Sequence, residues 1–386
     1  MMTLLYKFLF FSSLFFIVYS YILYPILLKV ISLFYTRQRI KADLTPTISM
    51  LVAAYNEQDV ILDKIQNTLE LDYPKENFEL VIGSDGSDDA TNDIVQMQDY
   101  PWLKFIPFEN RRGKAAMLNS LVQNARGEIL VFSDANTMYE PSAIKNLVQH
   151  FADPKVGGVC GRLYLNNPNH NPGGKGESLY WNYENILKSL ESKIKSVLGA
   201  NGAIYAMRKF LYKPLPEKIL IVDDFLTPIR VIEQDYEMVF DSDARAHETT
   251  SPSLMGEFRR KSRIGASNFT TLIELRHLLN PGKGFIALAF WSHKILRWLV
   301  PFFMILIFIS SFFLSFSLPL FSYLFFFQVI FYLAALAGYV LDSKMKCPRA
   351  LVYPYYFTAV NLALLVGFIR FLSRKQKPAW SRVERS

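Results

Sequence analysis

Cysteine is nearly absent from this chain of 386 residues. The two that occur, Cys160 and Cys347, lie in regions of unlike composition and fit no metal-ligand spacing. They support neither a zinc site nor a disulfide framework, and we interpret both as structural residues. The polar part of the chain also lacks a basic stripe with interleaved aromatic side chains, the pattern expected of a nucleic-acid-binding protein. No nucleic-acid partner is predicted.

Positive charge is in excess, and it lies beside apolar segments. The formal net charge is +8, with a pI near 9.2. Basic residues follow the first apolar run and flank the end of the last one: Arg37, Arg39, Lys41, Arg370, Arg374, Lys375 and Lys377. Cations in these places are typical of contact with lipid headgroups, so the sequence predicts a lipid bilayer as a partner.

Long apolar runs at both ends of the chain predict membrane spans. In residues 4–35 only Lys7 and Lys29 interrupt the run, which exceeds the roughly 20 residues that cross a bilayer. Because it continues without a small-residue cleavage site, we interpret it as an anchor rather than a signal peptide. Residues 299–316 and 318–341 predict two spans joined by a turn. Residues 350–372 are less apolar and either cross or lie partly in the interface, so three or four spans are expected.

Two alternatives stay open for residues 285–298. This segment places Trp291, His293, Lys294, Arg297 and Trp298 among apolar residues. The composition suits an amphipathic helix in the headgroup layer, and it also suits the start of the next span.

The positive-inside rule orients the chain. Arg37, Arg39 and Lys41 follow the first span, which predicts that the polar middle of the chain lies in the cytoplasm. Three crossing C-terminal spans would leave the basic tail outside, against the same rule. The expected protein is integral to the plasma (inner) membrane. Its expected regions are an anchor (1–36), a cytoplasmic domain (45–270), an interfacial helix with C-terminal spans (285–372) and a basic tail (373–386).

The middle of the chain alternates between strand-like and helix-like patterns. Residues 48–54, 79–84 and 129–133 are short apolar runs rich in β-forming residues, and each ends in a polar cluster. Such alternation predicts an α/β domain with a mainly parallel sheet. Ligands bind at the carboxyl ends of the strands in these sheets, so the polar clusters are expected to share one rim. They lie at 55–57, 85–89 and 134–136.

Each cluster has its own chemistry. Asp85 lies on a glycine-containing turn, where its carboxylate can accept hydrogen bonds from a nucleobase or a ribose. Asp89 follows at an expected helix start and can act as a cap, so a plain strand-to-helix turn also explains this cluster. Asp134 and Asn136 offer a carboxylate and an amide to a hard cation that bridges a diphosphate. Residues 110–114 (Asn-Arg-Arg-Gly-Lys) supply cations and backbone donors near a phosphate.

In order and spacing, these motifs resemble the membrane branch of the family 2 glycosyltransferases, which includes cellulose, hyaluronan, chitin and poly-N-acetylglucosamine synthases. Residues 52–57 (Val-Ala-Ala-Tyr-Asn-Glu) resemble the family's opening strand and turn, and residues 85–89 its Asp-Gly-Ser-x-Asp element. Residues 113–119 are similar to its Gly-Lys-x-x-Ala-Leu-Asn stretch. The resemblance covers most of the chain and implies a GT-A type nucleotide-sugar-binding domain flanked by transmembrane helices.

The resemblance also implies roles for individual residues. Asp85 would hold the nucleobase, and residues 134–136 would occupy the Asp-x-Asp position, where Asp134 and Asn136 would hold Mg²⁺ or Mn²⁺. Asn136 stands in place of the family's second acid. The full donor-binding set would be Tyr55, Glu57, Asp85, Lys114, Asp134, Arg260 and Arg263.

Two later motifs complete the expected site. Residues 221–225 (Ile-Val-Asp-Asp-Phe) lie where the family carries Thr-Glu-Asp, which assigns Asp224 as the general base toward the acceptor hydroxyl. An inverting transfer needs such an acid, and the adjacent Asp223 is expected to raise its pKa. The helix dipole alone would also favour two acids in a first helical turn. Residues 259–264 align with the family's Gln-x-x-Arg-Trp motif, which makes Arg263 the candidate diphosphate clamp.

The acceptor side is expected near residues 196–203, a small-residue segment that resembles a family strand and turn, with Asn201, Gly202 and Asp223 facing the acceptor. A tight turn against the sheet is the alternative. Helical spacing of Glu177, Trp181 and Glu184 predicts a helix packed on the domain or lining the acceptor cleft.

Together the motifs predict an inverting, metal-dependent glycosyltransferase of cell-surface polysaccharide biosynthesis. It would move a hexose or N-acetylhexosamine from a nucleotide sugar, a UDP-sugar being favoured, to a glycan or lipid-linked acceptor. A processive polysaccharide synthase is the alternative, and the small number of spans and the lost aromatic platform at Ile264 count against it. A further alternative is a catalytically idle membrane scaffold.

Overall fold

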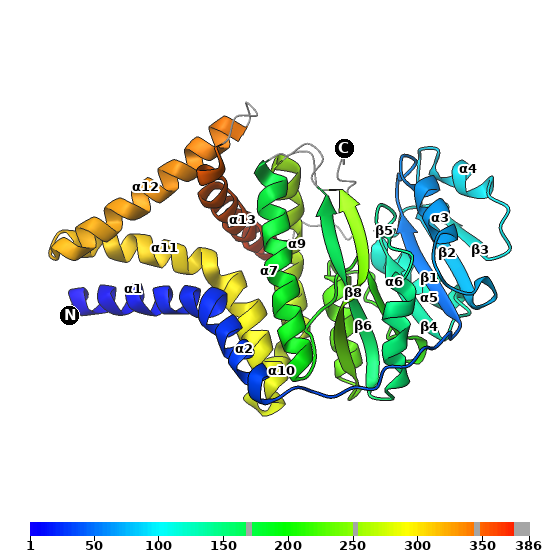
Figure 1. Ribbon diagram of the computed structural model, residues 1–386. Helices are drawn as coiled ribbons and strands as arrows, with labels where there is room; N and C mark the ends of the chain where they lie inside the picture. The colour runs from blue at the N-terminus through cyan, green and yellow to red at the C-terminus, as the bar shows by residue number, and fades with distance from the viewer. Residues whose placement is uncertain (167–171, 250–253, 343–347, 374–386) are drawn as a thin grey trace.

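A computed structural model describes residues 1–166, 172–249, 254–342 and 348–373. In it, a helix-covered sheet lies on one side and a group of long apolar helices extends from the other (Figure 1). Cys347 and residues 374–386 of the expected basic tail lie outside the described residues.

The sheet has the strand order β3-β2-β1-β4-β7-β6-β8-β5. Neighbouring strands from β3 to β4 are parallel, as are β6 and β8, whereas β7 is antiparallel to both β4 and β6 and β5 is antiparallel to β8. The predicted α/β class with a mainly parallel sheet is confirmed. The strands are β1 (Ile48–Ala54), β2 (Phe78–Asp85), β3 (Leu103–Phe108), β4 (Ile129–Ser133), β5 (Met138–Tyr139), β6 (Val156–Asn166), β7 (Tyr205–Arg208) and β8 (Glu237–Thr249).

The parallel register brings the ends of the first strands to one rim. Ile48 pairs with both Phe78 and Ile129, so β1, β2 and β4 start level. All three strands are mostly apolar and almost entirely buried, because helices cover both faces. The polar clusters after these strands therefore meet at the carboxyl edge of the sheet, as their sequence positions predict.

The strand expected within residues 196–203 is absent from the structure. Only Asn201 forms an isolated bridge, to Ile204, and the strand itself begins at Tyr205. Gly199 has a φ of 93°, which interrupts extended backbone, and the amide of Ala200 donates to the carbonyl oxygen of Asp224 (2.7 Å). Small side chains allow this loop to pack against a helix, and that close approach replaces strand pairing.

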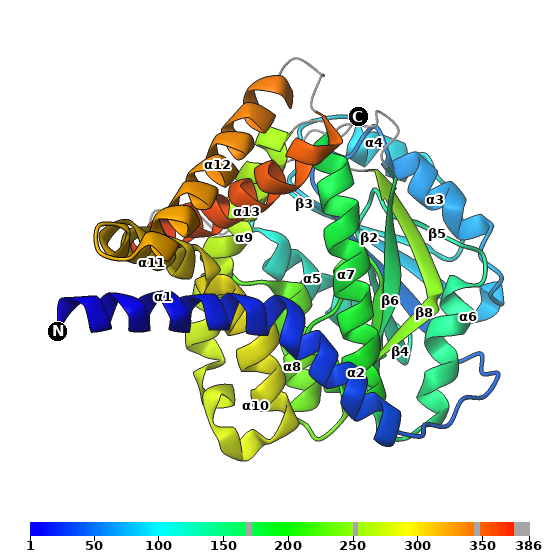
Figure 2. The same ribbon diagram turned by 60° about the vertical axis from the view of Figure 1, so that its left-hand side comes forward.

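Helices cover both faces of the sheet, and α7 and α9 stand between the sheet and the long apolar helices (Figures 1 and 2). The predicted helix over Glu177, Trp181 and Glu184 is confirmed as part of α7. One apolar core includes residues of α5, α7 and α8, and the other includes residues of α3 and α6. The helices of this part are α3 (Ile61–Leu69), α4 (Thr91–Gln96), α5 (Lys114–Asn124), α6 (Ala143–Val148), α7 (Pro172–Ile194), α8 (Asp223–Ile232) and α9 (Leu254–Glu274).

Within the described residues, four helical stretches are long and apolar enough to cross a membrane: Met2–Phe34, Phe285–Ser315, Pro319–Leu341 and Arg349–Leu372. The hairpin expected near residues 317–319 is present, since one helix ends at Ser315 and the next begins at Pro319. The elements are α1 (Met2–Val18), α2 (Tyr24–Phe34), α10 (Phe285–Ala289), α11 (Leu296–Ser315), α12 (Pro319–Asp342) and α13 (Arg349–Leu372).

Two of these stretches bend at π-helical turns, η1 (Tyr19–Leu23) and η7 (Phe290–Ile295). The bends lie side by side, and Tyr19 Oη and Ser292 Oγ are 2.9 Å apart across them. A π turn widens the helix locally, which is a known cause of sharp bends. In Figure 1, α2 and α10 lie at the end of the apolar helices nearest the sheet, and α1 and α11 continue away from it.

The structure decides between the two expectations for residues 285–298. The segment continues directly into α11, and His293 and Arg297 are buried against α7 rather than facing headgroups. It is therefore the start of the second of the four apolar stretches, and its charged side chains pack on α7 instead of forming an exposed polar face. Composition left both alternatives open because buried ion pairs and a solvated polar face place the same residue types on a helix.

Candidate active site

A cavity of about 330 Å³ opens at the carboxyl edge of the sheet, between the rim, the start of α8 and α9. Most of the residues expected to bind the donor, hold the metal or act as the base line it, although they come from five separate segments of the chain. These lining residues are Glu57, Lys114, Asp134, Asn136, Asp223, Asp224, Arg260 and Arg263.

Lys114 connects two acidic segments across the cavity. Its Nζ lies 3.2 Å from Asp134 Oδ1 and 3.3 Å from Asp223 Oδ2. The charges of these carboxylates and of Asp224 raise the pKa of Lys114, although burial opposes them. A permanently charged amine thus stands between the end of β4 and the start of α8, where a diphosphate would also find a cation.

Asp224 occupies the first turn of α8, and its carboxylate has an unusual environment. Burial, and next the negative charge of Asp223, raise the pKa of Asp224 to about 6, although Lys114 and Lys188 oppose this. The amide of Gly202 donates to Asp224 Oδ2 (3.2 Å). A Cβ atom at residue 202 would lie 2.8 Å from the same oxygen, so glycine is required for this approach. A carboxylate with a raised pKa and a fixed orientation suits proton acceptance near neutral pH.

Asp85 lies at the end of β2 with its side chain fully buried. Its Oδ1 accepts from the amide of Arg112 (2.7 Å), and its Oδ2 accepts from that of Gly113 (2.9 Å). Gly113 has a φ of 99° and precedes the first residue of α5, Lys114. Asp85 does not line the cavity within the described part of the chain, and its contacts there hold the turn that presents Lys114.

Tyr55 and Glu57 follow β1. The guanidinium of Arg111 stacks 3.7 Å from the centre of the Tyr55 ring, next to the Asp85 turn. Glu57 lines the cavity, and its amide donates to Thr91 Oγ1 (2.8 Å). The cap expected at Asp89 is not at the cap position, which Ala90 occupies without a side-chain cap hydrogen bond. Asp89 Oδ1 instead accepts from the amide of Thr91 (2.9 Å), two residues on, in the turn that leads into α4.

The motif on α9 lines the opposite wall. Arg260, Arg263 and Ile264 all face the cavity. Arg260 is engaged by acids, since its Nε donates to Glu257 Oε2 (2.8 Å) and its Nη2 contacts Glu177 on α7. The arginine at position 260 therefore ties α7 to α9 while it borders the cavity.

Asn201 lies behind the cavity wall and is fully buried. Its Nδ2 donates to the carbonyl oxygen of Gly161 (2.6 Å), and its amide donates to Cys160 Sγ (3.1 Å). Cys160 is buried and unbridged, in agreement with a structural role. Of the expected acceptor-side residues, Asp223 alone lines the cavity in the described part of the chain, and Gly202 contacts it through Asp224.

Sequence reasoning missed Glu217, which lines the cavity from the loop ahead of α8. Its Oε2 accepts from Arg112 (3.2 Å), and its Oε1 accepts from Asn119 Nδ2 (3.1 Å). Asn119 also exchanges two hydrogen bonds with the backbone of Leu215 (2.9 and 2.8 Å). The asparagine that ends the Gly-Lys motif was the available signal, since it holds the loop that carries Glu217.

The residues present fit a divalent metal that shares its ligands with a donor diphosphate. Asp134 and Asn136 both line the cavity, where they can offer a carboxylate and an amide oxygen to a hard cation. The described ranges contain no group of three or more His, Cys, Asp or Glu residues that could hold an ion. Mg²⁺-type sites often use one or two carboxylates and leave other positions to water and phosphate.

A family model described as "Glycosyltransferase like family 2" matches residues 46–266, which is more than half of the chain. The chain belongs to glycosyltransferase family 2. This confirms the resemblance carried by the motifs and the enzyme class that they predict.

Curated relatives of the chain are synthases of poly-β-1,6-N-acetyl-D-glucosamine. The protein from Staphylococcus epidermidis is 25% identical over 230 residues, which cover 58% of this chain and 55% of the relative. The protein from Staphylococcus aureus strain MSSA476 is 33% identical over 130 residues, covering 33% and 31%. The chain thus spans about half the length of the first of these relatives.

A solved structure shares the fold over nearly the whole chain. It is the mannosyltransferase PcManGT from Pyrobaculum calidifontis in complex with GDP-Man and Mn²⁺, at a TM-score of 0.71 and 20% identity. The match covers 97% of this chain and all of that one. The GT-A type domain with apolar helices at both termini is thereby confirmed.

Proposed function

We propose that this family 2 enzyme is an inverting glycosyltransferase that moves a sugar from a nucleotide-sugar donor to a glycan or lipid-linked acceptor. The observation that carries the proposal is the position of Asp224 in one cavity with Asp134 and Lys114. A base with a pKa of about 6 stands there beside groups suited to a charged diphosphate.

Asp224 accepts the proton of the acceptor hydroxyl as that oxygen attacks the anomeric carbon. Inversion requires the hydroxyl to approach from the side opposite the departing diphosphate, so base and diphosphate groups must lie on different sides of the sugar. Asp224 comes from α8, whereas Asp134 follows β4 and Arg263 is on α9. This separation of elements supports the assignment of Asp224 as base and of Arg263 as diphosphate clamp.

Donor binding rests on the turn held by Asp85. Because the carboxylate of Asp85 fixes the amides of Arg112 and Gly113, it sets the direction from which Lys114 enters the cavity. Tyr55, stacked on Arg111, and Glu57 complete the donor side. Asp134 and Asn136 would hold Mg²⁺ or Mn²⁺, which supplies positive charge to the diphosphate leaving group.

The acceptor and the donor sugar are proposed from the chemistry of the chain and from its similarity to curated relatives. The names of the curated relatives support an N-acetylhexosamine as the transferred sugar, for which a UDP-sugar is the donor that the motif resemblance favours. The described apolar helices support an acceptor held at a membrane. In the proposed topology, the domain at 45–270 faces the cytoplasm from the plasma (inner) membrane, because Arg37, Arg39 and Lys41 follow the first span.

The test is turnover by the purified full-length protein with UDP-sugars and GDP-mannose, in the presence of Mg²⁺, Mn²⁺ or a chelator. We expect a metal-dependent release of nucleoside diphosphate that is greatest with one UDP-sugar. In Asp224→Asn, we expect release or transfer to fall by about 10²–10⁴, the contribution of a general base. Full activity of Asp224→Asn would remove the assigned base, and failure with every donor would favour the idle scaffold.

Polymer synthesis is the second candidate, and the curated relatives favour it because each is named as a polymer synthase. Ile264 lines the cavity where an aromatic acceptor platform is expected in polymerising members, which favours single or short additions. Product sizing separates the two: a ladder of long products from one donor would establish the synthase, and products extended by one or a few sugars would exclude it.

A further inference from the structure

The loop behind Asp224 controls where its carboxylate points. The amide of Ala200 donates to the backbone oxygen of Asp224 (2.7 Å), and the amide of Gly202 donates to Asp224 Oδ2 (3.2 Å). These contacts grip the residue at both its backbone and its side chain. Any shift of residues 200–202 therefore moves the carboxylate.

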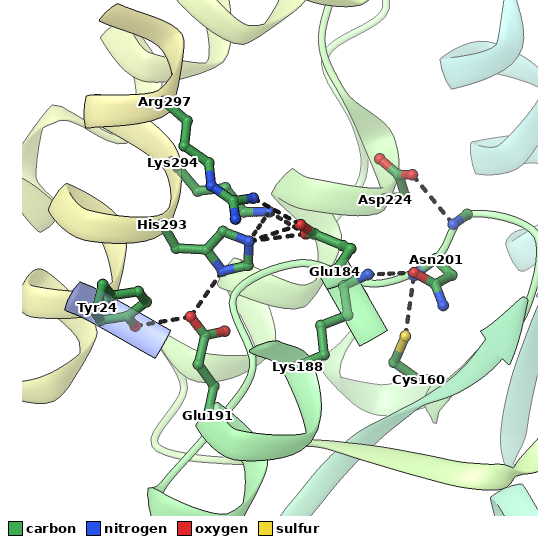
Figure 3. A network of polar contacts seen from close by, with 11 residues as sticks. Tyr24, Cys160, Glu184, Lys188, Glu191, Asn201, Asp224, His293, Lys294 and Arg297 are labelled. Atoms are coloured by element: carbon green, nitrogen blue, oxygen red, sulfur yellow. Dashed lines mark hydrogen bonds and ion pairs between the residues drawn. The ribbon is translucent and has the colours of Figure 1, made fainter. Parts of the chain in front are cut away.

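Asn201, in the middle of this loop, is anchored by a buried lysine. Lys188 on α7 is 2% exposed, and its Nζ donates to Asn201 Oδ1. The amide group of Asn201 donates in turn to Gly161 on β6 (2.6 Å). Figure 3 shows Lys188 reaching from α7 toward Asn201, with Asp224 beyond the loop. Lys188 is therefore the link between α7 and the loop that orients Asp224.

The charge of Lys188 has no ion-pair partner among the described residues. A buried ammonium is costly unless a negative charge lies near it. Asp224 provides such a charge from across the loop, and the charge of Lys188 lowers the pKa of Asp224. The other charged groups that act on Asp224 are Asp223 and Asp134, which raise its pKa, and Lys114, which lowers it.

The turns of α7 on either side of Lys188 are clamped to the bent apolar helices. Glu184, four residues earlier, accepts from Lys294 Nζ (3.1 Å) and Arg297 Nη1 (3.0 Å), and lies 2.9 Å from His293 Nε2. Its charge is thus compensated locally rather than by Lys188.

Glu191, three residues after Lys188, completes the clamp. Its Oε1 accepts from Tyr24 Oη (2.9 Å) and lies 2.8 Å from His293 Nδ1. Figure 3 shows His293 between the two glutamates. These contacts fix the position of α7 along its axis and its rotation about that axis. They therefore fix the point from which Lys188 reaches the loop of residues 200–202.

We propose that Lys188 is a positioning residue for the reaction: it fixes the loop of residues 200–202 through Asn201, and it places a buried positive charge behind that loop, on the side away from Asp224. The inference rests on the proposed role of Asp224 as the base. Lys188 itself lies outside the described cavity lining and touches neither donor nor acceptor in this assignment.

The experiment compares Lys188→Met with Lys188→Arg in the purified full-length protein, with kcat and donor KM measured from pH 5 to pH 9. Methionine keeps the apolar length of the side chain and removes both the charge and the donor. We expect kcat at pH 7 to fall about tenfold or more with donor KM changed less than about threefold, as for a misplaced catalytic group. The acidic limb of the plot of kcat against pH should also move to higher pH. In Lys188→Arg, this limb should lie close to its position in the unchanged protein.

Lys104→Met is the matched control. Lys104 lies on β3, away from Asp224, and its Nζ also donates to an uncharged oxygen, the backbone carbonyl of Asn124 (2.9 Å). It should leave the acidic limb in place. If Lys188→Met does not fold, Lys188→Gln tests the same idea, since it removes the charge and keeps a polar amide to face Asn201 Oδ1. An acidic limb at the unchanged pH in the folded variant, at any rate of turnover, would overturn the inference.

The inference and the proposed function fail differently. If Asp224→Asn keeps full turnover, Asp224 is not the base and the role of Lys188 falls with it. If Asp224→Asn is inactive and Lys188→Met keeps the unchanged acidic limb, the base stands and the inference alone is wrong.

Discussion

Replacement of Asp224 by asparagine should make the protein more stable and less active at the same time. In the folded protein the pKa of Asp224 is raised from 3.8 to about 6, so its ionised form is disfavoured relative to the unfolded chain. A raised folded-state pKa stabilises the fold at pH values below the unfolded pKa, and this stabilisation is lost as pH rises through about 6. At neutral pH the ionised carboxylate therefore destabilises the fold, and a neutral amide does not.

The magnitude follows from the shift. Two pKa units correspond to about 3 kcal/mol at pH values above both pKa values. Because the carboxyl group is partly exposed at the cavity wall, we reduce this for solvent screening to about 1–2 kcal/mol at pH 7.5. For a domain of this size that corresponds to a rise in Tm of about 2–8 °C. An asparagine oxygen can still accept from the amide of Gly202, so no hydrogen bond needs to be lost.

The assay is thermal unfolding of the ligand-free protein in one detergent, followed by tryptophan fluorescence at pH 4 and pH 7.5. We expect Asp224→Asn to melt above the unchanged protein at pH 7.5. At pH 4 we expect it to melt within about 2 °C of the unchanged protein, because there Asp224 is protonated in the folded state and only partly ionised in the unfolded chain, so most of the destabilisation is gone. Asp99→Asn, at an exposed position, should leave Tm nearly unchanged at both pH values. A lower Tm for Asp224→Asn at pH 7.5, or an equal gain at both pH values, would refute the electrostatic reasoning.

Four further substitutions test the site and its support. Lys114→Met should raise donor KM about tenfold or more and move the acidic limb of kcat to higher pH, because Lys114 lowers the pKa of Asp224; an unmoved limb would contradict this. Asn136→Asp should lower the Mn²⁺ concentration for half-maximal turnover about tenfold, since it adds a charged ligand; no change would place the metal elsewhere. Gly202→Ala should cut kcat about tenfold or more with donor affinity kept, because its Cβ meets Asp224 Oδ2 at 2.8 Å; unchanged kcat would show that the loop yields. Gly367→Val should lower the free energy of unfolding by about 1–3 kcal/mol in chemical denaturation, because a Cβ there lies 2.7 Å from the Ser262 carbonyl oxygen on α9; unaltered stability would exclude tight packing of α13 on α9.

Local patterns were sufficient for the elements and the chemistry of the rim. The strands at 48–54 and 129–133 have the residues expected, because an apolar run buried on both faces is visible without its partners. The cluster at 134–136 was recognisable because a carboxylate directly after a buried strand has few structural reasons to be there. The apolar helices follow from length and composition alone, since a bilayer imposes both on any chain that crosses it.

The sequence could not show which polar residues face the cavity and which are tied to one another. Asp85 and Asn201 carry the residue types of a binding site, yet both are buried and bonded to neighbouring backbone in the structure. Arg260 borders the cavity, and acids on α7 and α9 hold it there. Such pairings join positions dozens of residues apart, and no local spacing encodes them.

Only the tertiary structure shows where the charged side chains of residues 285–298 point and which residues of α7 they contact. The sequence determined that His293, Lys294 and Arg297 lie on an apolar helix, but their direction depends on Glu184 and on the helix that carries it. A buried charge is costly unless an opposite charge or polar partners compensate it, and the bend at η7 brings His293, Lys294 and Arg297 into contact with Glu184. The sequence therefore determined which chemistry this protein carries, and the packing of distant helices determined where each charged group acts.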